Sequence, residues 1–101
     1  MGRYKVMVDD NFHYMDEDER SEYATFSTAG EALAACRMLV DEWLVRHHKP
    51  GMSADELYQH YTSFAYDPFI VAPPQSERVH FSAWDYARGR IEAICGTRVS
   101  R

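Results

Sequence analysis

The sequence TAGEALAACRMLVDEWLVRHHK, residues 28–49, is the longest stretch of this chain with helical periodicity. Its apolar side chains recur at helical intervals, which places them in a stripe along one face of a helix. The stripe consists of Leu33, Cys36, Val40, Trp43 and Leu44. We expect the other elements of the fold to pack on this face, because a helix with an apolar stripe must bury it against a neighbour.

Both ends of this helix are marked in the sequence. Thr28 and Glu31 have the spacing of a capping box, in which each side chain accepts a hydrogen bond from an orphan backbone N–H group of the other residue. At the other end, residues 47–49 (HHK) place positive or potentially positive groups at the negative end of the helix dipole. Pro50-Gly51 then forbids continuation of the helix.

Two strands are predicted before this helix. Tyr4, Val6 and Val8 alternate with more polar residues, which indicates a half-buried strand, and alternation resumes over residues 22–27. The intervening residues 9–21 are strongly acidic and have no sustained periodicity, so they are predicted to form a long charged loop. Because this connection has no room for a crossover helix, we expect the two strands to be antiparallel.

A second helix is predicted to begin at the Ser53 and Glu56 capping box and to run to about residue 63. Its apolar face, formed by Leu57, Tyr61 and Phe64, is expected to dock on the first helix. Asp67-Pro68 is expected to stop the helix, and the apolar run at residues 69–72 is predicted to form a third strand, at an edge of the sheet. The pairing partner of this strand does not follow from the sequence.

A third helix is predicted to begin at Ser82, with Asp85 completing a weaker capping pattern, and to end at Gly96. Residues 97–101 are expected to form a frayed tail. Its inward face is expected to contain Trp84, Ala87, Ile91 and Ile94.

The element order β-β-α-α-β-α predicts one α+β domain over residues 1–101, with a small antiparallel sheet and three helices packed on one of its faces. One core is expected to unite the apolar faces of all these elements. Its predicted members are Val6, Val8, Phe26, Leu33, Cys36, Val40, Trp43, Leu57, Tyr61, Ile70, Trp84, Ile91 and Ile94.

The composition excludes several classes of function. The chain has 11 Lys and Arg against 16 Asp and Glu, a formal net charge of -5, which repels a phosphate backbone and argues against nucleic acid as a partner. It contains no apolar stretch long enough to cross a membrane and no apolar leader, so we expect a cytoplasmic location and no membrane partner. Cys36 and Cys95 lie on apolar helix faces and are expected to be packing residues.

The acidic segment at residues 9–20 is the main functional candidate. Our leading hypothesis is a non-enzymatic interaction module that uses this loop, with two exposed tyrosines, to contact a basic protein surface or a second copy of the chain. The candidate partner-binding residues are Asp9, Asp10, Phe12, His13, Tyr14, Asp16, Glu17, Tyr58 and Tyr66.

The alternative hypothesis is a divalent metal site, structural or catalytic, in the same loop, because hard cations prefer carboxylate and amide oxygens. Its candidate ligands are Asp9, Asp10, His13 and Asp16. The loop does not have EF-hand spacing, since Tyr14 occupies the position that requires glycine and Arg20 occupies the position of the bidentate glutamate.

Other chemistries have little support in the sequence. Adjacent His47 and His48 point about 100° apart on a helix and lack a nearby ligand partner, so they are interpreted as helix-end charge rather than as a zinc site. The apolar surroundings of Cys36 are expected to raise the pKa of its thiol, which argues against a nucleophile. The chain has no phosphate-binding or hydrolase motif, and no cofactor is expected.

Several segments together resemble a family of small, uncharacterised bacterial proteins of about 100 residues. These segments are YKVMVDDNFHYMDEDER (4–20), EALAACRMLVDEWL (31–44), KPGMSADELYQHY (49–61), DPFIV (67–71) and FSAWDYA (81–87). The resemblance covers nearly the whole chain and implies a soluble, single-domain cytoplasmic protein. It implies no particular activity, cofactor or catalytic residue.

Overall fold

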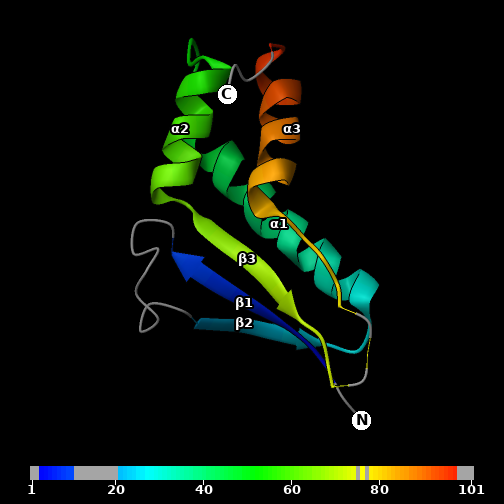
Figure 1. Ribbon diagram of the computed structural model, residues 1–101. Helices are drawn as coiled ribbons and strands as arrows, with labels where there is room; N and C mark the ends of the chain where they lie inside the picture. Colours follow the sequence, from blue (N-terminus) through cyan, green and yellow to red (C-terminus); the bar gives the residue numbers. More distant parts are fainter. Residues whose placement is uncertain (1–2, 11–20, 75, 77, 98–101) are drawn as a thin grey trace.

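A computed structural model describes residues 3–10, 21–74, 76 and 78–97 of the chain. The fold is α+β, with three strands and three helices in the predicted order β-β-α-α-β-α (Figure 1). The elements are β1 (Tyr4–Asp10), β2 (Ser21–Phe26), α1 (Ala29–His47), α2 (Ala54–Phe64), β3 (Tyr66–Val71) and α3 (Ala83–Cys95). The helices pack against one face of the sheet, as the sequence predicts.

The sheet is antiparallel and has the strand order β2-β1-β3, which makes β3 an edge strand. Val6 of the central strand lies opposite Ala24 of β2 and Ile70 of β3. Val6 and Ile70 are buried, so this position of the ladder carries part of the core. The register of β1 with β2 shifts between Val6 and Met7, whereas the ladder between β1 and β3 is regular.

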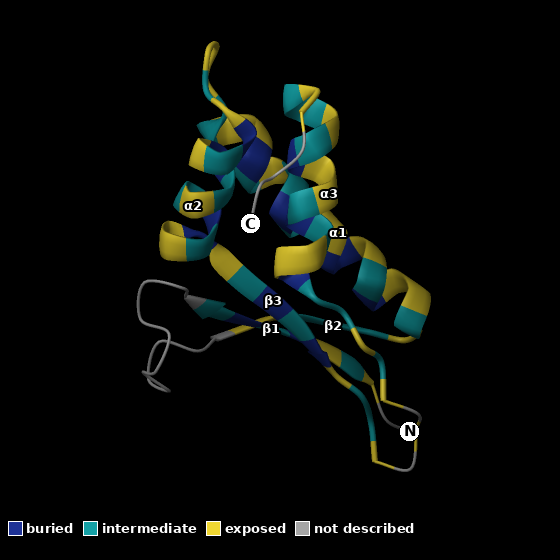
Figure 2. Cartoon of the chain, turned by 45° about the horizontal axis from the view of Figure 1, so that its top comes forward, coloured by how far each residue is buried: buried dark blue, intermediate teal, exposed yellow. Residues whose placement is uncertain are grey.

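Helix α1 joins two parts of the core. Cys36, in the N-terminal half of α1, packs with Val6 and Ile70 of the sheet. Val40 and Leu44, nearer the C-terminus of α1, pack with α2 and α3. The buried residues of the helices lie on the sides that the helices turn toward one another (Figure 2). The expectation that the other elements pack on residues 28–49 is therefore confirmed.

The helix starts follow the local sequence signals. The hydroxyl Oγ of Ser53 accepts a hydrogen bond from the backbone N–H of Glu56, and Oε1 of Glu56 accepts one from the N–H of Ser53, each at 3.1 Å. Thr28 Oγ1 likewise accepts from the N–H of Glu31 at 3.1 Å. The carboxylate of Glu31 accepts from the Thr28 hydroxyl at 3.1 Å, whereas the sequence predicts that it reaches the Thr28 backbone.

Several predicted core positions are wrong. Trp84, a predicted core residue, is 39% exposed in the first turn of α3, and Phe64, which was expected to dock on the first helix, is 53% exposed at the last residue of α2. Other predicted core residues are half-buried, namely Phe26, Leu33, Trp43 and Ile94. Small residues occupy much of the core instead: Ala32, Ala35, Ala54, Ala65, Ala83 and Ala87 are all buried.

The boundary between α2 and β3 also differs from the prediction. Helix α2 ends at Phe64, and the N–H of Ala65 closes it by donating to the carbonyl of Tyr61 at 3.0 Å. Asp67-Pro68 does not stop the helix; both residues belong to β3, which begins earlier than expected. Helix α3 ends as predicted at Gly96, which adopts a left-handed conformation with φ 73°. The predicted frayed tail lies outside the described residues, apart from Thr97.

Candidate functional site

Two carboxylates lie opposite each other where β1 ends and β3 begins. Asp9 of β1 lies directly opposite Asp67 of β3 in the antiparallel ladder. Partial burial raises the pKa of the Asp67 carboxyl, and the neighbouring charge of Asp9 raises it further. Like charges directly opposite each other in a ladder repel, which disfavours the pair when both carboxyls are ionised.

The carboxylate pair borders a surface pocket of about 600 Å³, which we name the acidic pocket. Its lining includes three carboxylates and one imidazole, together with several aromatic rings. The lining residues are Asp9, Tyr58, Asp67, Phe69, His80, Phe81, Ser82, Ala83, Trp84 and Asp85. The combination of negative charge with aromatic surface suits an organic cation.

Helices α2 and α3 each supply one aromatic residue to the acidic pocket. Tyr58 comes from α2, and its ring lies 5.9 Å below the guanidinium carbon of Arg88. Trp84 stands in the first turn of α3, whose start is set by Ser82 Oγ accepting from the N–H of Asp85 at 3.3 Å. This cap places the indole at the pocket wall rather than in the core.

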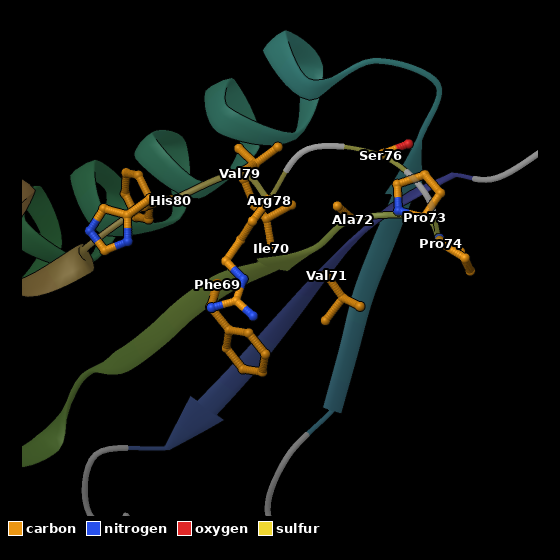
Figure 3. A pocket seen from close by; sticks show the side chains of 11 residues that line it. Phe69, Ile70, Val71, Ala72, Pro73, Pro74, Ser76, Arg78, Val79 and His80 are labelled. Atoms are coloured by element: carbon orange, nitrogen blue, oxygen red, sulfur yellow. The ribbon is translucent and has the colours of Figure 1, made fainter.

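A second pocket of about 560 Å³ continues along the edge strand, and we name it the edge groove (Figure 3). It is bounded on one side by residues 69–74 and on the other by Ser76 and residues 78–81. Phe69, His80 and Phe81 line both pockets, so the acidic pocket and the edge groove adjoin. Together they follow β3 for most of its length.

The structure unites some of the predicted partner-binding residues. Asp9 and Tyr58, which are far apart in the sequence, line the same pocket. Asp10 pairs with Tyr66 at the next position of the ladder, and Tyr66 is exposed. The remaining candidates lie outside the described residues: Phe12, His13, Tyr14, Asp16 and Glu17.

Asp9 and Tyr58 are the predicted site residues among the ten that line the acidic pocket, and Asp67, Phe69 and Trp84 are among the others. The sequence predicts that Asp67 stops a helix, that Trp84 lies in the core and that Phe69 belongs to a strand. The sequence shows the carboxylate of Asp67 close to aromatic Phe69. Only the pairing of β3 with β1, however, brings Asp67 opposite Asp9.

A separate aromatic cluster joins α1 and α2 near the C-terminus of α1. The rings of Trp43 and His47 are stacked with centroids 4.2 Å apart, and the His47 and His60 centroids are 5.7 Å apart. Burial lowers the pKa of His47, and the neighbouring His60 lowers it further. His47 is thus part of an interhelical cluster, in addition to the helix-end position predicted from the sequence.

The described residues contain no group of three or more His, Cys, Asp or Glu side chains arranged to hold a metal ion. Of the predicted metal ligands, Asp9 and Asp10 belong to β1, whereas His13 and Asp16 lie outside the described residues. Burial raises the pKa of the Cys36 thiol to about 11, as expected from its apolar neighbours, which makes it a poor nucleophile at neutral pH.

Comparison with known proteins leaves the site to be interpreted from its own geometry. No protein-family model, curated protein or solved structure in these comparisons matches the chain. Within the part of the chain that the structure describes, no helix is both long enough and apolar enough to cross a lipid bilayer.

Proposed function

We propose that this protein is a non-enzymatic binding module that recognises a basic segment of a partner protein in the acidic pocket. The observation that supports it is the cross-strand pair of Asp9 and Asp67 in a pocket with aromatic walls. A lysine or arginine side chain entering the pocket would relieve the repulsion between these carboxylates. The partner's charge would also complement the net charge of -5 of the chain.

The aromatic walls add a second attraction for the same ligand. A cation placed over an aromatic face is stabilised by about 0.5–2 kcal/mol, more when water is excluded. Trp84 is placed to supply such a face, and Tyr58, whose ring already carries the guanidinium of Arg88, lines the same pocket. Because Asp67 is partly buried, its interaction with a cation is screened less than that of a surface carboxylate. The pocket therefore favours a side chain that carries both an aliphatic stem and a positive head.

A peptide titration tests this proposal. The full chain, labelled with ¹⁵N, is titrated with a lysine-rich peptide and with the same peptide in which glutamate replaces lysine. We expect the basic peptide alone to shift the amide signals of Asp67, Trp84 and Asp85. Weak binding that depends on salt is expected, because part of the attraction is Coulombic.

Variants of single carboxylates provide the control. Asp67→Asn is expected to weaken binding by about tenfold, as removal of one charged hydrogen-bonding partner commonly does. Glu42→Gln removes the same charge from the exposed side of α1, away from the pocket, and is expected to leave binding unchanged. Equal losses in both variants would show only a response to net charge and would contradict a specific pocket.

A divalent metal ion remains the second candidate ligand, since the opposed carboxylates of Asp9 and Asp67 are also what a hard cation prefers. Titration with Mg²⁺, Ca²⁺ and Zn²⁺ distinguishes the two ligands. Amide shifts confined to the C-terminal end of β1 and to residues 9–20, without a response to the basic peptide, would favour the metal. A response to the peptide alone would favour the interaction module.

A cellular location and a mode of self-association are also part of the proposal. We propose that the module acts in the cytoplasm, where both cysteines would stay reduced; Cys36 and Cys95 are free thiols in the structure. We propose a second copy of the chain as an alternative partner, which would use its second half because that half is near neutral and less acidic than the first. Light scattering at low and high salt tests this, because association through the acidic pocket should weaken as salt rises.

A further inference from the structure

The outer edge of β3 exposes backbone groups that can pair with another strand. Successive residues of a strand direct their N–H and C=O groups to opposite sides. Pro68 has no N–H and cannot donate to β1, and the carbonyl of Tyr66 accepts from the Tyr61 hydroxyl of α2 at 2.9 Å. Both observations place the even-numbered residues of β3, including Ile70, with their backbone groups on the outer edge.

No strand occupies this edge among the residues that the structure describes. The segment after β3 reverses direction and lines the other side of the edge groove. In the described part of this segment, the N–H of Ser76 donates to the carbonyl of Pro73 at 3.2 Å. Ile70 and Ala72 line the groove (Figure 3). An edge with unpaired donors and acceptors is a template for an added strand.

The edge groove adjoins the acidic pocket at one end, where Phe69 lines both. Arg78 also lines the groove, and its side chain extends toward Phe69 (Figure 3). Pro68 removes a donor near the acidic end, so the N–H groups of Ile70 and Ala72, beyond the proline, are the donors for backbone pairing along the groove. From Asp67 to Ala72 an extended strand rises roughly 17 Å. A segment of about six residues therefore spans both the pocket and the pairing positions.

We propose that the basic partner binds as an extended strand along β3, pairing with the backbone of Ile70 and Ala72 and placing one lysine or arginine side chain in the acidic pocket. This inference rests on the proposed function and specifies its binding mode. Main-chain hydrogen bonds would supply affinity, and the pocket would select the residue at one position, which is the usual division in strand addition.

The test uses a capped peptide of about six residues in which lysine and valine alternate, added to the full ¹⁵N-labelled chain. Two further versions carry N-methyl groups on every second residue, in the two alternative phases. One phase blocks the edge that faces β3 and the other blocks the edge that faces solvent. We expect the first to bind at least about tenfold more weakly and the second to bind like the parent peptide.

Amide hydrogen exchange supplies an independent readout. The parent peptide is expected to slow exchange of the Ile70 and Ala72 amides by about tenfold or more at saturation. Equal affinity of both methylated peptides, with unchanged exchange at Ile70, would overturn strand addition but would leave the acidic pocket as a binding site. Failure of every basic peptide to bind would instead overturn the proposed function itself.

A variant pair checks the pairing from the protein side. Ala72→Pro removes one edge donor just beyond the last residue that pairs with β1, whereas Ala72→Ser keeps the donor. We expect the proline variant to bind the parent peptide about three- to tenfold more weakly and the serine variant to bind normally. Shifts of the Asp67 and Trp84 amides report whether the pocket still responds. Equal affinity of the two variants, with intact fold by amide spectra, would contradict the pairing at Ala72.

Discussion

The phenolic hydroxyl of Tyr86 donates toward both carboxylate oxygens of Asp41, at 3.1 and 3.0 Å. Arg90 Nε, one helical turn from Tyr86, also donates to Asp41 at 3.1 Å. Asp41 lies on α1 and both partners lie on α3, so this network fixes one helix against the other. Its position is relevant to function because α3 carries Trp84 and Asp85 of the acidic pocket.

Tyr86→Phe should lower the free energy of unfolding by about 1–2 kcal/mol, since a partly buried hydrogen bond to a charged acceptor is lost without a change of shape. Urea denaturation measures the change. Tyr23→Phe is the matched control: Tyr23 is 47% exposed, and its loss of a hydroxyl should change stability by less than about 0.5 kcal/mol. Equal effects of the two changes would show that the Asp41 bond contributes nothing.

The His47 cluster predicts a loss of stability on acidification. The pKa of His47 is lower in the folded protein than its ordinary value of 6.5, so the unfolded chain binds the proton first as the pH falls. The free energy of unfolding should therefore decrease as the pH falls through 6.5 and stop changing below the folded pKa. His47→Gln should reduce this dependence in denaturation curves recorded across that range, whereas His48→Gln should preserve it. The same slope in both variants would exclude His47 as its source.

The local signals in the sequence predicted the elements, because each is decided within a few residues. The Ser53 and Glu56 capping box and the terminal Gly96 appear where expected, since both depend only on backbone groups of the same helix turn. The same local reasoning predicted wrongly that Asp67-Pro68 stops the second helix, whereas both residues belong to β3. Proline is compatible with an edge strand as well as with a helix end, and only the strand order, which the sequence does not reveal, distinguishes the two.

The acidic pocket depends on relationships between distant elements. The opposition of Asp9 and Asp67 requires the pairing of β1 with β3, which are separated by β2 and two helices in the chain. Helical spacing assigned Trp84 to the apolar face of α3 together with buried Ala87 and Ile91, but spacing along one helix cannot show where the neighbouring helix ends. The sequence therefore identified Asp9 and Tyr58 as candidates without showing that they share a pocket.

Asp67→Asn should stabilise the free protein while it weakens binding of the lysine-rich peptide. The pKa of Asp67 is raised in the folded state, so its favourable contribution is present below 3.8 and is lost as the pH rises through the folded pKa. At neutral pH the ionised Asp67 carboxylate lowers the stability of the folded protein. Asparagine removes this cost, so the free energy of unfolding should rise by about 0.2–1 kcal/mol. Thermal melts at neutral and acidic pH measure the gain, which should vanish at the acidic end.

Glu42→Gln is again the control for Asp67→Asn, because it removes one negative charge from the exposed side of α1. The same gain from both variants would mean that general charge repulsion is responsible. A stabilised Asp67→Asn variant that binds the peptide as tightly as the parent would separate the carboxylate pair from the binding site and contradict its proposed role.

Trp84→Ala should separate binding from stability, because the indole is 39% exposed at the wall of the acidic pocket. Truncating a tryptophan in a core costs about 3–5 kcal/mol, whereas here we expect about 1 kcal/mol or less. Affinity for the lysine-rich peptide should fall by about tenfold, since an aromatic face for the cation is lost. Trp84→Phe should recover part of this affinity because it keeps such a face, and a phenylalanine variant no better than alanine would argue against a cation over the ring.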